Sequence, residues 1–238
     1  MQATPPPESP ALVHRHPATD RKEQFRKDFA SHCQNSKCWR VRKEGEIYFR
    51  CKGCDDSLYC SKDCQKAAWP THRDECKTAQ EARAAMSPTE RTNREKLLAY
   101  TEKHSPIICA AALRGLELDR DLSRSQQYYF EIETEVREGQ TRPETAFYVT
   151  RASPQLLMCH PNRRDIWKTL KEQVEVKKDT QMATVGAFCV EVVCRSLNVQ
   201  TRFPVVVDEE VLTFQEPSGD RSLWHQALFR NMNEGIVY

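Results

Sequence analysis

The sequence lacks any long hydrophobic run. Across 238 residues, no stretch reaches the roughly 18 to 20 apolar residues that a membrane-spanning helix needs. The first ten residues, MQATPPPESP, also lack the apolar core of a signal peptide. The formal net charge of +2 is close to neutral and gives no overall argument for a nucleic-acid or membrane-surface partner. We therefore expect an intracellular protein, in the nucleus or the cytoplasm, that does not bind membranes.

Glycine is also scarce. The chain has seven glycines and contains neither a Gly-rich phosphate-binding loop nor a G-x-S-x-G nucleophile motif. The one adjacent nucleophile and base in the second half of the chain is Cys159-His160. Neighbouring side chains on an extended chain point to opposite sides, so such a pair is more often incidental than catalytic. The sequence therefore predicts that the protein is not an enzyme.

Cysteine, in contrast, is abundant. The chain has 11 cysteines, and seven of them lie with one histidine between residues 33 and 76. The eight residues form four closely spaced pairs: Cys33 and Cys38, Cys51 and Cys54, Cys60 and Cys64, His72 and Cys76. In a reducing compartment, clustered cysteines are metal ligands more often than disulfides. Eight such donors fill two tetrahedral zinc sites completely, which is typical of structural zinc and not of catalytic zinc.

Residues 59–76, YCSKDCQKAAWPTHRDEC, resemble the second half of a MYND-type zinc finger. The family pattern is C-x2-C, then Y-C-x3-C-Q, a tryptophan and H-x3-C, and the sequence matches each element. The resemblance covers residues 33–76. It implies two zinc ions with interleaved ligands, the first bound by Cys33, Cys38, Cys60 and Cys64 and the second by Cys51, Cys54, His72 and Cys76.

The first ligand pair departs from the family pattern. The pattern has C-x2-C here, whereas this sequence has four residues between Cys33 and Cys38. The longer loop still permits chelation, and His32 is the alternative ligand to Cys33. A finger ahead of a mixed helix and sheet region also resembles fungal MYND proteins of unknown role.

The resemblance implies a protein–protein interaction module. MYND fingers are in general adaptors, often for short proline-containing peptides and frequently in transcriptional regulation. The residues that would contact a peptide are Gln65 and Trp69, although Trp69 could instead pack inside the finger. The alternative is an enzyme or enzyme relic in the C-terminal domain. A SET-type methyltransferase is disfavoured because its Asn-His-Ser motif and downstream cysteine cluster are absent.

A nucleic-acid partner is also disfavoured. The segment between Cys38 and Cys51 is basic, but Glu44 and Glu46 dilute its charge and no recognition helix follows. A solvated surface explains these charges better. The sequence does not indicate an oligomeric state.

The predicted fold is a small two-zinc, cross-braced finger followed by an α+β (mixed α/β) domain. Residues 1–19 are predicted to form a disordered proline-containing tail, and residues 20–32 a helix that leads into Cys33. In the finger, residues 33–76, we predict a short hairpin within 39–50 and two short helices that Pro70 separates. Residues 77–87 are predicted to form a helical linker.

Residues 88–238 contain segments with the apolar spacing of helices and segments with that of strands. Ser87 and Glu90 have capping-box spacing and predict a helix to about residue 103, after which Ser105-Pro106 restarts a second helix over 107–116. The most apolar stretch, residues 184–196, predicts a buried central strand. Three further strands are predicted at 127–135, 146–151 and 203–207. Two amphipathic helices are predicted at 164–177 and 222–232.

Overall fold

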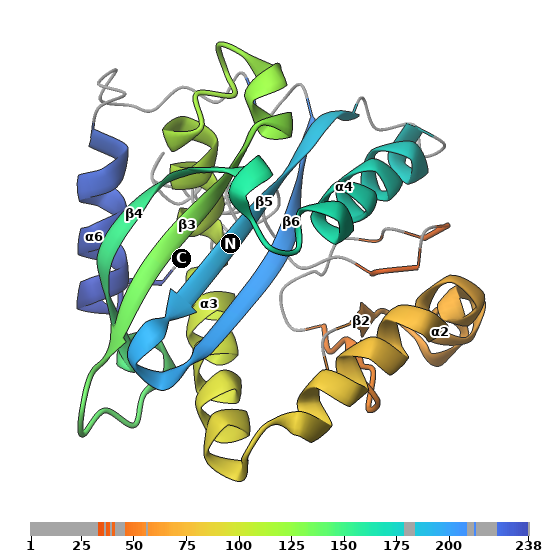
Figure 1. Cartoon of the computed structure of the whole chain (residues 1–238), viewed down its shortest axis with the longest axis horizontal. Helices are drawn as coiled ribbons and strands as arrows, with labels where there is room; N and C mark the ends of the chain where they lie inside the picture. The colour runs from red at the N-terminus through yellow and green to blue at the C-terminus, as the bar shows by residue number, and fades with distance from the viewer. Residues whose placement is uncertain are drawn as a thin grey trace, which may run out of the picture.

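The computed structural model describes residues 33–35, 37, 38, 40, 46–55, 57–178, 184–208, 212 and 223–237. The predicted tail and the predicted helix at 20–32 lie outside these residues, and so do residues 39 and 41–45 of the segment in which the hairpin was expected. The described chain contains a small cysteine-rich finger and a downstream region of helices and one larger sheet (Figure 1).

One long helix, α2 (Lys62–Ala85), carries the second half of the finger. It begins at Ser61, whose hydroxyl accepts a hydrogen bond from the Cys64 N–H at 3.1 Å. The prediction of two short helices is wrong, because α2 continues through Pro70. Proline removes one helix hydrogen bond. Here the helix is held on both sides of Pro70, by Cys64 before it and by His72 after it, since both residues belong to cysteine clusters of the finger.

The second long helix, α3 (Pro88–Gly115), begins at the predicted capping box. Ser87 and Glu90 each bond the other's backbone N–H, at 3.2 and 2.8 Å. The predicted break at Pro106 is wrong, because α3 runs through it. Residues on both sides of Pro106, among them His104 and Ile108, are buried against the rest of the domain. Tertiary packing therefore outweighs the lost hydrogen bond.

The larger sheet has the strand order β4-β3-β5-β6 (Figure 1). Strands β3 (Tyr128–Val136) and β4 (Phe147–Leu156) form an antiparallel pair. Helix α4 (Arg163–Lys178) then leads to β5 (Thr184–Cys194), which is parallel to β3, and β6 (Val199–Asp208) returns antiparallel to β5. All four predicted strands are present, and β5 is an inner strand of the sheet, as its apolar sequence predicted. Short 3-10 turns lie between these elements: η1 (Leu122–Gln126), η2 (Pro143–Thr145), η3 (Leu157–Cys159) and η4 (Arg195–Leu197).

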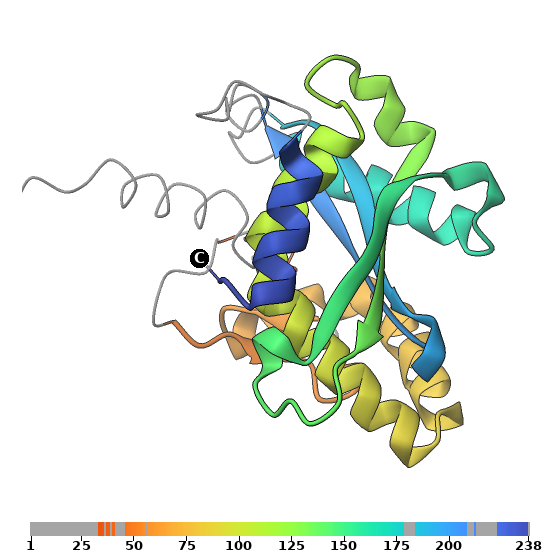
Figure 2. The same cartoon turned by 90° about the vertical axis from the view of Figure 1, so that its left-hand side faces the viewer.

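Helices cover both faces of this sheet. Helices α3 and α6 (Trp224–Glu234) lie on one face, and α4 lies on the other (Figure 2). Alternate residues of a strand pack on opposite faces of the sheet, because successive side chains point in opposite directions. Phe130 and Phe188 pack in the larger core with α3 and α6, whereas Tyr129 and Cys189 pack with α4. The domain is thus a helix-covered mixed sheet with its own apolar core.

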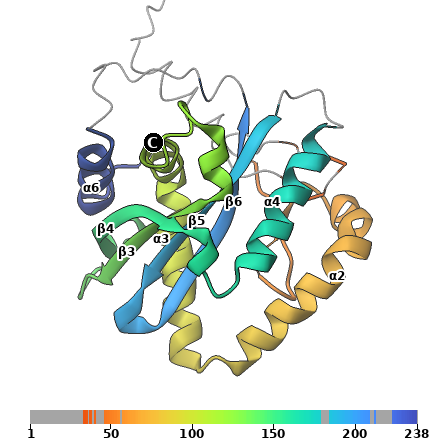
Figure 3. The same ribbon diagram turned by 45° about the horizontal axis from the view of Figure 1, so that its top comes forward.

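The finger adjoins this domain through α2 and α3. Figure 3 shows α2 passing beside α4 before the chain turns into α3. Arg50 forms an ion pair with Glu102 on α3, and Arg83 forms one with Glu95 at 3.3 Å. These contacts tie β1 of the finger and the last turn of α2 to α3. Among the residues that the structure describes, no helix is long and apolar enough to cross a membrane.

Candidate metal centre

The eight predicted ligands come together as two groups of four. In each group the sulfur and nitrogen atoms all lie within 4.8 Å of one another. The ligand sets interleave along the sequence, as the resemblance implied. The first group is Cys33, Cys38, Cys60 and Cys64, and the second is Cys51, Cys54, His72 and Cys76.

The distances within each group fit tetrahedral zinc. With a Zn–S bond of about 2.3 Å, two sulfurs on one zinc lie about 3.8 Å apart, and a sulfur and an imidazole nitrogen about 3.6 Å apart. The measured Sγ–Sγ distances are 3.6 Å for Cys38 and Cys60 and 3.7 Å for Cys51 and Cys76. Cys54 Sγ lies 3.6 Å from His72 Nε2. Both groups are therefore already spaced for one zinc ion each.

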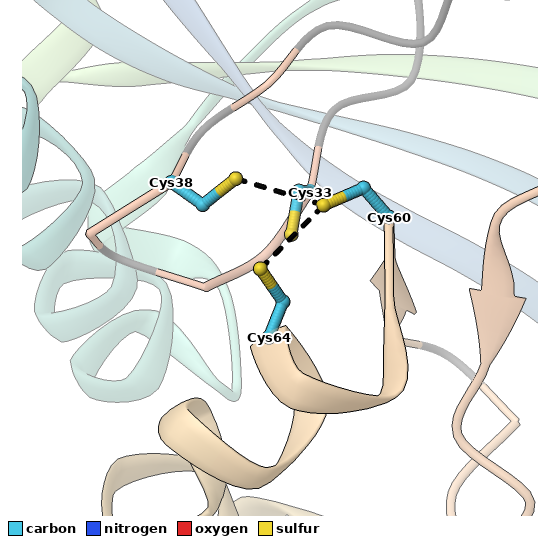
Figure 4. Close-up of side chains that lie close together, drawn as sticks. All are labelled: Cys33, Cys38, Cys60 and Cys64. Carbon is cyan, nitrogen blue, oxygen red and sulfur yellow. Dashed lines mark hydrogen bonds between the residues drawn. The ribbon is translucent and has the colours of Figure 1, made fainter.

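The first group joins a loop to the start of α2 (Figure 4). Cys60 directly precedes the helix cap and Cys64 lies in its first turn, with their sulfurs 3.5 Å apart. A turn closes the longer Cys33–Cys38 loop, because Cys38 N–H donates to the carbonyl of Asn35 at 2.8 Å. This turn explains how the four-residue spacing still chelates. Cys33 is the ligand of this group, whereas the alternative, His32, lies outside the described residues.

The second group joins a tight turn to the middle of α2. Cys51 and Cys54 flank a turn whose Gly53 has no room for a side chain, since a Cβ there would lie 2.9 Å from Cys76 Sγ. His72 and Cys76 are one helical turn apart on α2, so they face the same side. Ser57 Oγ lies 3.4 Å from His72 Nδ1. A hydrogen bond there fixes the imidazole with its Nε2 lone pair toward the group.

Two polar residues that sequence reasoning missed support these groups. The Asn35 side chain is buried and lowers the pKa of the Cys64 thiol to about 7 through a hydrogen bond. Gln80, one turn beyond Cys76 on α2, donates to its sulfur at 3.2 Å. Burial raises the pKa of Cys60 to about 12, so metal binding must displace its proton. The spacing of Gln80 from Cys76, i and i+4, was visible in the sequence, whereas that of Asn35 gave no signal.

A short pair of strands closes the finger. Strand β1 (Phe49–Arg50) pairs antiparallel with β2 (Leu58–Tyr59) across the Cys51–Cys54 turn. Phe49 therefore pairs with Tyr59. Ile47, which precedes β1 and lies within the segment predicted as a hairpin, is 83% exposed. Of the opposing arm of that hairpin, the structure describes Arg40, which forms an ion pair with Glu46.

The two residues suggested for peptide contact lie one turn apart on α2. Gln65 is half-buried, and Trp69 is 44% exposed. The indole of Trp69 touches the His72 ring edge-on, with ring centroids 6.1 Å apart. The alternative in which Trp69 fills the interior of the finger does not match this exposure. That interior instead holds Cys33, Tyr48, Cys51, Cys54, Tyr59, Ala68 and Cys76.

Cys159 and His160 are not brought together as a nucleophile and base. Cys159 is exposed, whereas His160 is buried. His160 Nδ1 accepts the Asn162 N–H at 3.0 Å, so its Nε2 carries the proton and donates to Glu191 at 3.3 Å. Both ring nitrogens are occupied, and neither can take a proton from the thiol.

His160 belongs instead to a buried polar cluster that the sequence did not reveal. Glu191 on β5 accepts from His160 and, at 3.1 Å, from Arg202 Nε on β6. Glu191 interrupts the most apolar run in the chain, which was the only available signal. Identifying its partners requires the strand register, in which Glu191 lies opposite Arg202.

Comparison with known proteins places the finger in a family. The sequence profile of the MYND finger matches residues 31–76. The MYND-type zinc finger protein samB of Emericella nidulans is 46% identical over 46 residues, which are 19% of this chain and 8% of that protein. The samB protein of Aspergillus clavatus is 43% identical over 44 residues, 18% of this chain and 7% of that protein.

This chain therefore matches less than a tenth of the length of these curated relatives. No solved structure matches the chain. The family match and the two ligand groups cover the same segment. Residues 31–76 are a MYND finger, a domain that generally mediates protein–protein contacts, with two Cys/His groups that fit two zinc ions.

Proposed function

We propose that this chain is an adaptor whose finger binds short proline-containing segments of other proteins at Gln65 and Trp69. The two ligand groups support a binding role. Each offers four protein ligands, so a zinc ion held there has no open position for water or substrate. The metal would stabilise the finger, and recognition would fall to side chains on its surface.

The exposure of Trp69 carries the proposal. The ring lies on α2 between Cys64 and His72, which belong to different ligand groups, so both metal sites hold the helix around it. The exposed part of the indole offers a large apolar surface that a partner can bury. Indole faces pack well against proline rings, and the amide of Gln65 beside it can bond a peptide backbone. A rigid aromatic residue next to an amide is a suitable contact for an extended proline-containing segment.

A substitution series tests this site. Trp69→Ala should reduce binding of a synthetic proline-rich peptide at least tenfold by isothermal titration calorimetry, with two zinc ions still bound per chain. Phe49→Ala is the matched control, because Phe49 is a finger aromatic that is 43% exposed. It should leave peptide affinity unchanged. Loss of zinc together with binding in Trp69→Ala would show instead that the indole is structural.

We also propose that the adaptor acts in transcriptional regulation and that the C-terminal domain is not catalytic. The engagement of both His160 nitrogens supports the second statement, since it removes the base beside Cys159. Tethering the full chain to a promoter through a DNA-binding domain should change reporter output, and Trp69→Ala should abolish the change. An unaltered reporter would limit the adaptor to other processes.

A further inference from the structure

The prolines of this chain are concentrated at its beginning. Five of its 13 prolines lie in the first 17 residues, and Pro5-Pro6-Pro7 is the only run of consecutive prolines in the sequence. Such a run favours the polyproline II conformation, which binds aromatic surfaces at low entropic cost. The chain therefore carries its own segment of the chemical class that the Gln65–Trp69 face would bind.

The proline segment is tethered close to that face. It joins the finger at Cys33, whose sulfur lies within 4.8 Å of that of Cys64. Trp69 is five residues further along α2, or about 7.5 Å along the helix axis. Pro7 precedes Cys33 by 26 residues. With residues 20–32 helical, as the sequence predicts, that part of the tether spans about 20 Å, and residues 8–19 span up to about 40 Å when extended. The segment can therefore reach Trp69.

The charges around Trp69 suit the tail sequence. Lys66 and Arg73 lie three residues before and four residues after Trp69, so they flank it on the same helix face, and both are exposed. Glu8 follows the proline run directly. Because a cation lies on each side of Trp69, Glu8 can form an ion pair in either direction of the bound segment, and an exposed pair of this kind adds little affinity.

We propose that the tail around Pro5–Pro7 docks on the Gln65–Trp69 face of its own finger and competes with partner segments. This inference rests on the proposed function and adds a mechanism by which the chain regulates its own binding site. A short tether gives a local concentration of about 1 mM. A tail that binds in trans with a Kd of about 0.1 mM would then occupy roughly 90% of the fingers and weaken partner binding about tenfold.

The test compares the wild-type full chain with a full-chain variant in which Pro5, Pro6 and Pro7 are all replaced by alanine. Two probes are titrated calorimetrically: a synthetic peptide of residues 2–17 and an unrelated decaproline peptide. Both should bind the triple variant about tenfold more tightly than the wild type. Trp69→Ala in the triple variant should abolish binding of both probes.

A spectroscopic readout separates docking from an indirect effect on affinity. The indole N–H resonance of Trp69, assigned with Trp69→Phe, should shift between the wild type and the triple variant. The resonances of Trp167 and Trp224, which lie in the C-terminal domain, should stay in place. A dependence of the Trp69 shift on protein concentration would overturn docking within one chain and indicate exchange between two copies.

The two proposals fail in different ways. If both probes bind wild type and triple variant with equal affinity, and Trp69→Ala still abolishes binding, tail docking is wrong and the adaptor site stands. If neither probe binds the triple variant, the adaptor site itself is wrong and tail docking falls with it.

Discussion

The finger and the sheet domain obtain their cores from different physical interactions. Four of the seven buried residues that form the core of the finger are ligand cysteines: Cys33, Cys51, Cys54 and Cys76. The sheet domain instead buries aliphatic and aromatic side chains between α3, α6 and the strands, among them Phe130, Phe147 and Phe188. A segment as short as the finger buries too little apolar surface to fold alone. Metal must therefore stabilise the finger, whereas the sheet domain can stabilise itself.

Removing a zinc ligand should produce the largest difference between the two regions. Cys60→Ser should lower the zinc content below two ions per chain and unfold the finger, since structural zinc supplies on the order of 10 kcal/mol to small domains. Hydrogen exchange should then lose protection in residues 46–76 and keep it in β3 and β5. Metal analysis and exchange mass spectrometry of one sample provide both readings.

Cys159→Ser is the matched control for this experiment. Cys159 is exposed and lies outside both ligand groups, so its replacement should leave two zinc ions and the exchange pattern unchanged. If β3 and β5 lost protection together with the finger in Cys60→Ser, the sheet domain would depend on the metal and the comparison would be wrong.

The reciprocal change is a cavity in the sheet domain. Phe188 is fully buried on β5, and Phe188→Ala should lower the free energy of unfolding of this domain by about 3 to 5 kcal/mol. The zinc content should remain at two ions, since no ligand is touched. Urea denaturation followed by Trp224 fluorescence measures the first effect. Phe49→Ala, in the finger, should leave that transition in place, and loss of zinc in Phe188→Ala would contradict the separation.

The finger and the sheet domain should also unfold at different pH values in acid. Hydrogen bonds and ion pairs with Arg151 and Arg195 lower the pKa of Glu133 to about 2. A lowered carboxyl pKa stabilises the fold above the unfolded value near 4.5, and this contribution is lost as pH falls toward 2. Because both arginines are largely exposed, solvent screening limits it to about 1 kcal/mol. The finger should unfold at higher pH, since its ligands must lose protons to hold zinc.

Glu133→Gln tests the contribution of the sheet. Between pH 4.5 and 2, the unfolding free energy of the variant should fall less steeply than that of the wild type in urea titrations. Glu138→Gln, at an exposed position in the turn after β3, should keep the wild-type slope. An unchanged slope in Glu133→Gln would mean that the ion pairs contribute nothing to stability.

Short-range patterns in the sequence predicted much of the structure. The four ligand pairs, the Ser87 capping box and the apolar run of β5 each depend on residues a few positions apart, and the structure confirms all three. The helix breaks predicted at Pro70 and Pro106 are wrong because contacts from distant residues decide both positions. Proline weakens a helix locally, but ligand groups and buried neighbours hold both helices from outside, and such distant constraints leave no local signature.

Contacts between distant segments explain the other omissions. Asn35 supports Cys64 from a loop whose turn was not foreseen. The cluster of His160, Glu191 and Arg202 forms only when β5 and β6 pair in one register and the residues before α4 fold over them. A shift of one residue would turn Glu191 to the opposite face, so composition and spacing could not reveal the cluster.

The smallest expected effect concerns the joint between the two regions. Arg50 on β1 donates to the Asp55 carbonyl at 2.9 Å and forms an ion pair with Glu102 on α3. Both charged side chains are partly exposed, so Arg50→Gln should cost under about 1 kcal/mol. The substitution should instead change the orientation of the finger relative to the sheet domain, because Arg50 ties the Cys51–Cys54 turn to α3. Residual dipolar couplings should fit one alignment tensor for finger and sheet in the wild type and two tensors in the variant.

Arg40→Gln is the control that distinguishes loss of the Arg50–Glu102 contact from a general loss of positive charge. Arg40 pairs with Glu46 inside the finger and does not cross to α3, so its replacement should preserve the single tensor. Arg83, which contacts both Asp55 and Glu95, remains in both variants as a second link. If Arg50→Gln also kept one tensor, this second link and the α2–α3 turn would be enough to orient the finger. The two regions would then differ in how they fold while behaving as one rigid unit.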